Sequence, residues 1–176
     1  MTDTREAMGH RFLRHAVGAR LAAVARMHWT HGGRVEDATG PLELRFDGGP
    51  TLVLSTGAHG EWLRVDPRPW IDSLAGGASD EDRAFAAEHG KMSRIDVSAL
   101  PGYADAVGRP LDGVRWMASG SGSVGGAELA FGPARLTMVS WGDDDHVFTG
   151  GADAVPAEWN FRVLPADEPL TGTDAP

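Results

Sequence analysis

Val17-Gly18-Ala19-Arg20-Leu21-Ala22-Ala23-Val24 is followed, ninety positions later, by Val107-Gly108-Arg109-Pro110-Leu111-Asp112-Gly113-Val114. In the same way, Glu43-Leu44-Arg45-Phe46 recurs as Glu128-Leu129-Ala130-Phe131, and Ser55 and Gly57 recur as Ser140 and Gly142. An internal repeat sets the architecture of a chain before any local pattern does. We therefore predict one β-rich domain at residues 1–164, built from two repeats at 17–65 and 107–148 that are joined by a connection at 66–106.

Alternating hydrophobicity predicts strands inside each repeat. Leu42, Leu44 and Phe46 alternate with Glu43 and Arg45, which is the pattern of a half-buried strand. Strands are also expected at 21–27, 51–56, 61–65, 129–131, 136–140, 146–148 and 159–164. A single three-stranded meander cannot bury its own apolar face, so the two antiparallel meanders are expected to pack together as a barrel or a sandwich.

Three helices are expected beside the strands, which makes the predicted fold mainly β with α+β character. An N-terminal helix is predicted at 3–16, where Asp3 and Glu6 have the spacing of a capping box and Gly18 follows the last turn. A second, brief helix is expected at 101–107, just before the second repeat.

A short connecting helix is predicted at 79–89. Ser79 is its expected N-cap, three acidic residues follow in the first turn, and Gly90 ends it. Phe85 and Ala86 are expected to form its buried side. Upstream of this helix, Asp66-Pro67-Arg68-Pro69-Trp70 is expected to be a rigid, extended exit from the first meander.

The composition restricts the chemistry and the partners. The 176 residues include no cysteine, which excludes disulfides, thiol nucleophiles and zinc thiolate sites. The formal charge is −9, and an acidic surface repels phosphate backbones, so nucleic acid is not an expected partner. Charge is also unevenly distributed, because residues 1–34 hold six Arg against two acids whereas residues 143–176 hold eight acids against one Arg.

The sequence is typical of a soluble cytoplasmic bacterial protein. It has no apolar run near the roughly 18 residues that a membrane span needs, and its first residues do not have the pattern of a signal peptide. Fifteen of its 16 basic residues are Arg, a bias typical of GC-rich genomes. The acidic, Pro-containing tail at 165–176 is expected to be disordered.

The first candidate site is Met27-His28-Trp29-Thr30-His31. The first repeat carries five more residues than the second between Met27 and Glu43, within the region 28–40. Duplicated units often lose their symmetry at the functional site. His28, Trp29 and His31 are therefore candidates to line a small-molecule pocket, and the two His are candidate proton-transfer groups. Their spacing gives no convincing metal site, and neither a metal nor a cofactor is expected.

The second candidate is the acidic turn Asp143-Asp144-Asp145-His146. Alternation along a strand places Asp144 and His146 on one face, which makes them weak candidates for an acid–base pair. The turn lacks the spacing of a calcium loop, and a solvated hairpin is the simpler interpretation.

Tryptophans are the third candidate. Six Trp is a high number for this length, and most are expected in the core or at sheet rims. Trp29, Trp62 and Trp141 are the candidates to contact an apolar ligand.

Two functions remain open after these observations. The first is a binding or interaction module without a catalytic motif, either immunity-like, with an acidic face that covers a basic protein partner, or a binder of small ligands. The alternative is a cofactor-independent enzyme that transfers protons on a small apolar metabolite, as an isomerase, cyclase or lyase does. A homodimer is compatible with either function.

Overall fold

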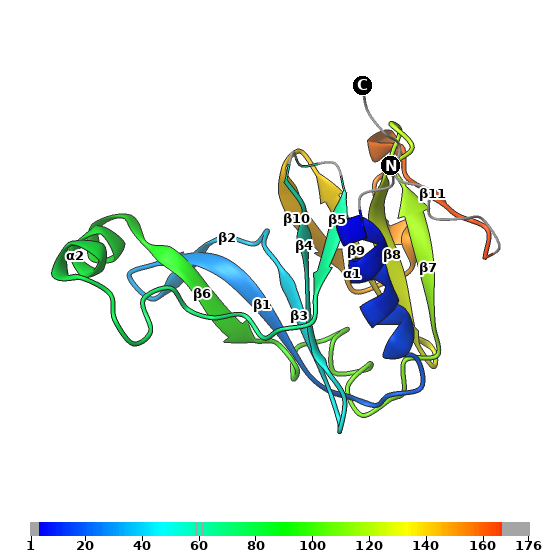
Figure 1. Cartoon of the computed structure of the whole chain (residues 1–176), viewed down its shortest axis with the longest axis horizontal. Helices are drawn as coiled ribbons and strands as arrows, with labels where there is room; N and C mark the ends of the chain where they lie inside the picture. The colour runs from blue at the N-terminus through cyan, green and yellow to red at the C-terminus, as the bar shows by residue number, and fades with distance from the viewer. Residues whose placement is uncertain (1–3, 59, 61, 167–176) are drawn as a thin grey trace.

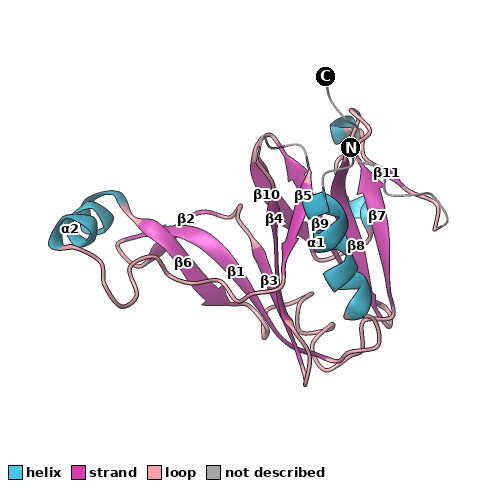
Figure 2. Cartoon of the chain, in the orientation of Figure 1, coloured by secondary structure: helices cyan, strands magenta, loops and turns pink. Residues whose placement is uncertain are grey.

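The computed structural model describes residues 4–58, 60 and 62–166, with the backbone alone for residues 4–8. Most of this part of the chain is strand (Figures 1 and 2). The helices are α1 (Thr4–His15) and α2 (Asp80–His89), with two 3₁₀ turns, η1 (Ala152–Ala154) and η2 (Ala157–Trp159). The strands are β1 (Leu21–His31), β2 (Arg34–Asp37), β3 (Leu42–Phe46), β4 (Thr51–Thr56), β5 (Leu63–Asp66), β6 (Lys91–Asp96), β7 (Gly113–Ala118), β8 (Val124–Phe131), β9 (Ala134–Trp141), β10 (Asp144–Phe148) and β11 (Arg162–Val163).

Two antiparallel sheets form the body of the molecule. The first has the order β2-β1-β3-β4-β5, with β6 added on the free side of β1, and the second has the order β10-β9-β8-β7-β11. Each sheet contains one predicted meander, β1-β3-β4-β5 in the first and β7-β8-β9-β10 in the second. The sheets stay separate, so the sandwich-like alternative fits and the barrel alternative does not.

The two segments that opened the sequence analysis contact each other. Gly18 donates its backbone N–H to the Leu111 carbonyl at 2.8 Å, and Gly108 donates to the Leu21 carbonyl at 2.8 Å. Arg20 and Pro110, at equivalent places in the two segments, form an antiparallel bridge between them. Each of these two hydrogen bonds mirrors the other, because Gly18 and Gly108, like Leu21 and Leu111, are ninety positions apart. A local twofold axis produces such reciprocal bonds.

The strand register corrects one pair of equivalent residues in the predicted matching of the two repeats. Leu44 pairs with Leu52, whereas Leu129 pairs with Leu136, because the turn between the strands is one residue longer in the first sheet. Ser140 is therefore the counterpart of Thr56 and not of Ser55. The Ser140 hydroxyl donates to the Thr56 hydroxyl at 2.8 Å across the two sheets.

One hydrophobic core lies between the sheets. It contains the inward side chains of both meanders, and Leu13 and Ala16 of α1 close one side of it. The core residues from the strands include Leu42, Leu44, Leu52, Leu54, Leu129, Phe131, Leu136 and Met138. Alternation in the sequence predicted these positions because a strand that is buried on one face must place every second side chain inward.

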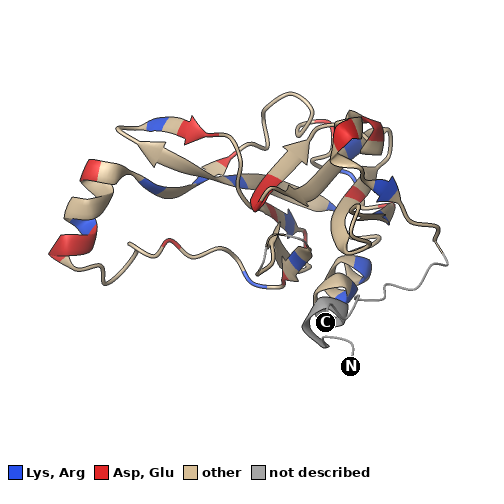
Figure 3. Ribbon diagram, turned by 90° about the horizontal axis from the view of Figure 1, so that it is seen from above, with Lys and Arg blue, Asp and Glu red and all other residues tan. Residues whose placement is uncertain are grey.

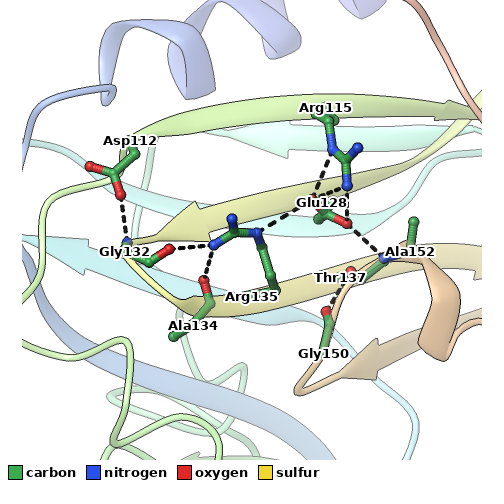
Figure 4. A network of polar contacts seen from close by, with 9 residues as sticks. All are labelled: Asp112, Arg115, Glu128, Gly132, Ala134, Arg135, Thr137, Gly150 and Ala152. Atoms are coloured by element: carbon green, nitrogen blue, oxygen red, sulfur yellow. Dashed lines mark hydrogen bonds and ion pairs between the residues drawn. The ribbon is translucent and has the colours of Figure 1, made fainter.

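A buried glutamate occupies the same position in each meander. The Glu128 carboxylate accepts from both Nη2 and Nε of Arg115 and from the Ala152 backbone at 2.6 Å (Figure 4). In the first sheet, Glu43 accepts from Arg94 at 2.7 Å and from the Trp70 backbone at 2.9 Å. Each carboxylate therefore fixes the chain segment that follows its own meander.

Part of the first sheet projects from the body as an arm (Figure 1). The arm consists of residues 28–37 and 72–94, which include the outer half of β1, all of β2 and α2, and the start of β6. Helix α2 has the predicted N-cap Ser79 and C-cap Gly90, and the structure adds a capping box between Ser79 and Asp82. The expectation of a buried side was wrong, because α2 has no buried residue and Phe85 is 58% exposed.

Other expectations also need correction. Residues 101–107 form turns and no helix, because only isolated i→i−4 bonds such as Val107 to Tyr103 are made. The predicted strand at 159–164 shrinks to Arg162–Val163, since Trp159 belongs to η2. Residue 3 and most of the predicted disordered tail, residues 167–176, lie outside the described residues.

Candidate functional site

A cleft of about 750 Å³ lies where the base of the arm meets the second sheet. Its lining combines segments far apart in the sequence: Trp29, Glu36, Asp37, Thr39, Gly40, Pro41, Ser55, Thr56, Gly57, Gly60, Met92, Asp143, Asp144 and Asp145. The five extra residues of the first repeat and the acidic turn of the second thus contribute to one site. The acidic turn between β9 and β10 has the place in its meander that the connection between β4 and β5 has in the first, with a different sequence.

The cleft is acidic with an apolar wall. Five of its lining residues carry carboxylates, and none of its described lining residues is Lys or Arg. Trp29 and Met92 pair across β1 and β6 and supply apolar surface. Helix α2, at the far end of the arm, is also rich in acidic residues (Figure 3). The cleft can therefore accept a cationic group that also presents an apolar surface.

Segment 38–41, which we call the strap, forms one wall of the cleft, and hydrogen bonds from the Arg26 side chain hold it in place. Arg26, which is buried, donates from Nη2 to the Ala38 carbonyl at 3.2 Å and to the Gly40 carbonyl at 2.9 Å. Gly40 has a φ of 133°, and a Cβ placed there would come within 1.8 Å of the Met27 carbonyl oxygen. Only glycine lets the strap lie this close to β1.

Asp145 joins the strap to both sheets. Its backbone carbonyl accepts from the Gly40 N–H at 3.0 Å. Its carboxylate accepts from the backbone N–H of Thr56 and, at 2.7 Å, from the Thr56 hydroxyl. Burial raises the pKa of the Asp145 carboxyl. Ser140 completes the junction by donating to Thr56 and to the Gly60 carbonyl.

The remaining carboxylates of the cleft are more exposed. Thr39 donates from its backbone and its hydroxyl to Asp37, both at 2.8 Å, and these bonds lower the pKa of Asp37. Asp143 has a φ of 68°, a left-handed conformation that Asp tolerates better than most residues. Gly60 lies so close that a Cβ there would meet the Asp143 carboxylate. The turn therefore holds its charged groups at the edge of the cleft.

The three histidines predicted from the sequence lie outside the lining. His28 is 9% exposed, bonds through Nδ1 to the Thr39 carbonyl at 3.1 Å, and has its pKa lowered by burial. His31 lies 3.4 Å from Glu36 on the arm. His146 contacts the Trp141 carbonyl at 3.2 Å. The contacts found for His28, His31 and His146 in the described part of the chain are thus with residues other than Asp144.

Of the three predicted tryptophans, one lines the cleft. Trp29 does so, with its indole Nε1 bonded to the His89 carbonyl at 3.1 Å. Trp62 packs over Gly57 next to the cleft and bonds to the Ala58 carbonyl at 2.8 Å. Trp141, 45% exposed, stacks on Trp159 with ring centroids 4.4 Å apart. That stack helps to pack the C-terminal segment against the second sheet.

Sequence reasoning missed Glu36, Asp37, Thr56 and Met92 as cleft residues. Glu36 and Asp37 lie in the region 28–40, where the first repeat has five extra residues, and that location could have indicated them. Met92 reaches the cleft only through the pairing of β6 with β1, which the sequence did not predict. Among the described residues, no group of three or more His, Asp and Glu side chains is placed to hold a metal ion.

Comparison with protein families, curated proteins and solved structures found no significant match to this chain. In the described part of the chain, neither helix has the length and hydrophobicity to cross a membrane.

Proposed function

We propose that this chain is a binding protein whose acidic cleft accepts a positively charged segment of a partner protein. The observation that carries the proposal is the lining of the cleft, in which five carboxylates occur together with the apolar Trp29 and Met92 and no described lining residue is Lys or Arg. A Lys or Arg side chain suits such a surface, because its aliphatic stem packs on apolar groups while its charge meets the carboxylates. The formal charge of −9 would also speed the approach of a basic partner.

The position of the cleft also supports binding. It combines the strap and the acidic turn, which differ between the two predicted repeats, with β4 residues such as Thr56 that have counterparts in the second meander. Because the strap is fixed by Arg26 and Asp145, the site needs little reorganisation when a ligand enters.

The alternative, proton transfer on a small metabolite, has one supporting observation, the raised pKa of Asp145. Its carboxylate is already bonded to Thr56. Acid–base catalysis needs a partner within hydrogen-bond reach of the substrate. None of the candidate histidines His28, His31 and His146 is among the described lining residues, although His31 lies 3.4 Å from the cleft residue Glu36. We therefore favour binding.

The test is a titration with a capped, Lys-containing glycine peptide, followed by calorimetry at low salt. The variant E36Q/D143N/D144N neutralises three rim carboxylates and preserves their shape, so we expect its affinity for the peptide to fall at least about tenfold. The matched control is E81Q/E88Q/E158Q, which removes the same charge at exposed positions outside the cleft.

The proposal requires the control to bind nearly as well as the native chain. Equal weakening of both triple variants would mean that the peptide responds to net charge alone. Failure of the native chain to bind the peptide at low salt would also reject the proposal.

A further inference from the structure

A second, smaller cavity adjoins the acidic cleft. It measures about 380 Å³ and is lined by Pro41, Val53, Ser55, Arg64, Asp66, Arg68, Pro69, Trp70 and Ile71. Pro41 and Ser55 line both cavities. A ligand that passes over these two residues would therefore contact both sites.

The smaller cavity has the opposite charge. Arg64 and Arg68 both bind Asp66, through contacts of 3.0 Å from Arg64 Nη2 and 2.9 Å from Arg68 Nη2. Arg68 also bonds through its Nε at 2.9 Å. Two guanidinium groups around one carboxylate leave one positive charge in excess. Each guanidinium carries five N–H donors, so several remain for another acceptor.

Asp66 holds the two arginines in position. It comes at the end of β5, and the Asp66-Pro67-Arg68-Pro69 sequence restricts the backbone that carries Arg68. The hydrogen bonds and charge of Arg68 lower the pKa of Asp66, which keeps it ionised. Trp70 is anchored through its own backbone N–H to Glu43 at 2.9 Å. The cavity therefore combines two guanidinium groups that share the Asp66 carboxylate with an apolar wall.

We infer that this cavity is an anion subsite and that the two cavities together recognise a peptide segment carrying a basic and an acidic group close together. The inference rests on the proposed function for the cation side and adds a carboxylate-binding side next to it. Paired guanidiniums are the groups that best recognise a carboxylate. Ser55, located at the boundary, offers a hydroxyl that makes no hydrogen bond within the described part of the chain.

The experiment compares two capped peptides in calorimetric titrations of the full chain. One contains Lys and glycine only, and the other adds an Asp after a glycine spacer whose length is varied. For the best spacer, we expect the mixed-charge peptide to bind about tenfold more tightly than the Lys peptide, because its second contact is made within one molecule. The gain should disappear in R64Q/R68Q, while the affinity of that variant for the Lys peptide should not fall, because the substitutions remove only positive charge near the cleft.

The matched control is R45Q, which removes one exposed arginine outside both cavities. Since loss of both arginines leaves Asp66 without a partner, the single variant R68Q provides a milder test in which Arg64 still binds Asp66. We expect R68Q to lose part of the gain, and R45Q to lose none.

The outcomes separate the two proposals. If mixed-charge peptides bind no better than the Lys peptide at any spacer length, the anion subsite is wrong while the cationic cleft stands. If the Lys peptide does not bind but the mixed-charge peptide binds through Arg64 and Arg68, the cationic cleft is wrong and the subsite stands. If neither peptide binds, both are wrong.

Discussion

The two meanders use one strand order but make their first connection differently. In the second sheet, β7 and β8 are joined by the short segment 119–123. In the first, β1 runs on to His31, turns into β2 and returns through the strap to β3. The same core positions are buried in both. Extra residues in a connection can therefore add an arm and a cleft without altering the core, because loop insertions cost little once the strands on either side are packed.

The largest expected effect is the loss of unfolding free energy when one of the two buried glutamates is removed, and it tests whether both stabilise the fold equally. Glu128 contacts two arginines and a backbone N–H, whereas Glu43 contacts one arginine and a backbone N–H. Removing one partner of a buried ion pair leaves the others unsatisfied. We expect E128A to lose about 3 kcal/mol of unfolding free energy and E43A about 2 kcal/mol, measured by urea unfolding.

The isosteric variant E128Q is the control for this comparison, because its amide oxygen can still accept from the Ala152 N–H. It should retain more stability than E128A. An equal loss in E43A and E128A would contradict the ranking and would show that the extra arginine contact contributes nothing.

A second comparison addresses the strap. At Gly40, φ is 133° and an added Cβ would lie 1.8 Å from the Met27 carbonyl oxygen. At Gly33, φ is 77° and an added Cβ would meet nothing within 4 Å. We expect G40A to lose about 2 kcal/mol and G33A about 1 kcal/mol, the latter from backbone strain alone. Thermal unfolding measures both.

The affinity for the Lys peptide should also differ between G40A and G33A. G40A should weaken the Lys peptide because the strap must move away from β1, whereas G33A should bind as the native chain does. Unchanged peptide affinity in G40A would mean that the strap does not shape the cleft.

A smaller effect is expected from the pH dependence of Asp145. Its pKa is raised in the folded chain, so the folded state gains stability as the pH falls through that raised pKa toward the ordinary value of 3.8. D145N cannot gain this stability and avoids the cost of burying a charge at neutral pH. We therefore expect its stability relative to the native chain to be highest near neutral pH and to decline on acidification, by less than about 1 kcal/mol.

Urea unfolding at a series of pH values between neutrality and mild acid would measure this difference. D47N, which changes an exposed carboxylate outside the cleft, is the control and should follow the native profile. A relative stability of D145N that rises on acidification would contradict the prediction.

The smallest expected effect concerns the tip of the arm. Phe85 is 58% exposed on a helix without buried residues. F85S should change the unfolding free energy by no more than about 0.5 kcal/mol, as is usual for surface substitutions. A loss above about 2 kcal/mol in thermal unfolding would mean that Phe85 belongs to a packed interface.

The positions of most strands followed from the sequence. Alternation in Leu42–Phe46 and Thr51–Thr56 predicted β3 and β4 with their observed bounds. The N-cap of α2 was predicted at Ser79, since capping depends on residues within one turn. The brief helix at 101–107 was predicted wrongly, because a local pattern cannot report the turns that the surrounding packing imposes.

From the sequence alone we predicted that functional features lie where the two proposed repeats differ, since shared positions are needed for the core. Only the tertiary structure decided how those features meet. Gly40 bonds to Asp145 from more than a hundred residues away, and Pro41 and Ser55 link the acidic cleft to the arginines after β5. These contacts depend on how two separate sheets pack, and a one-dimensional pattern carries no information about distance between strands of different sheets.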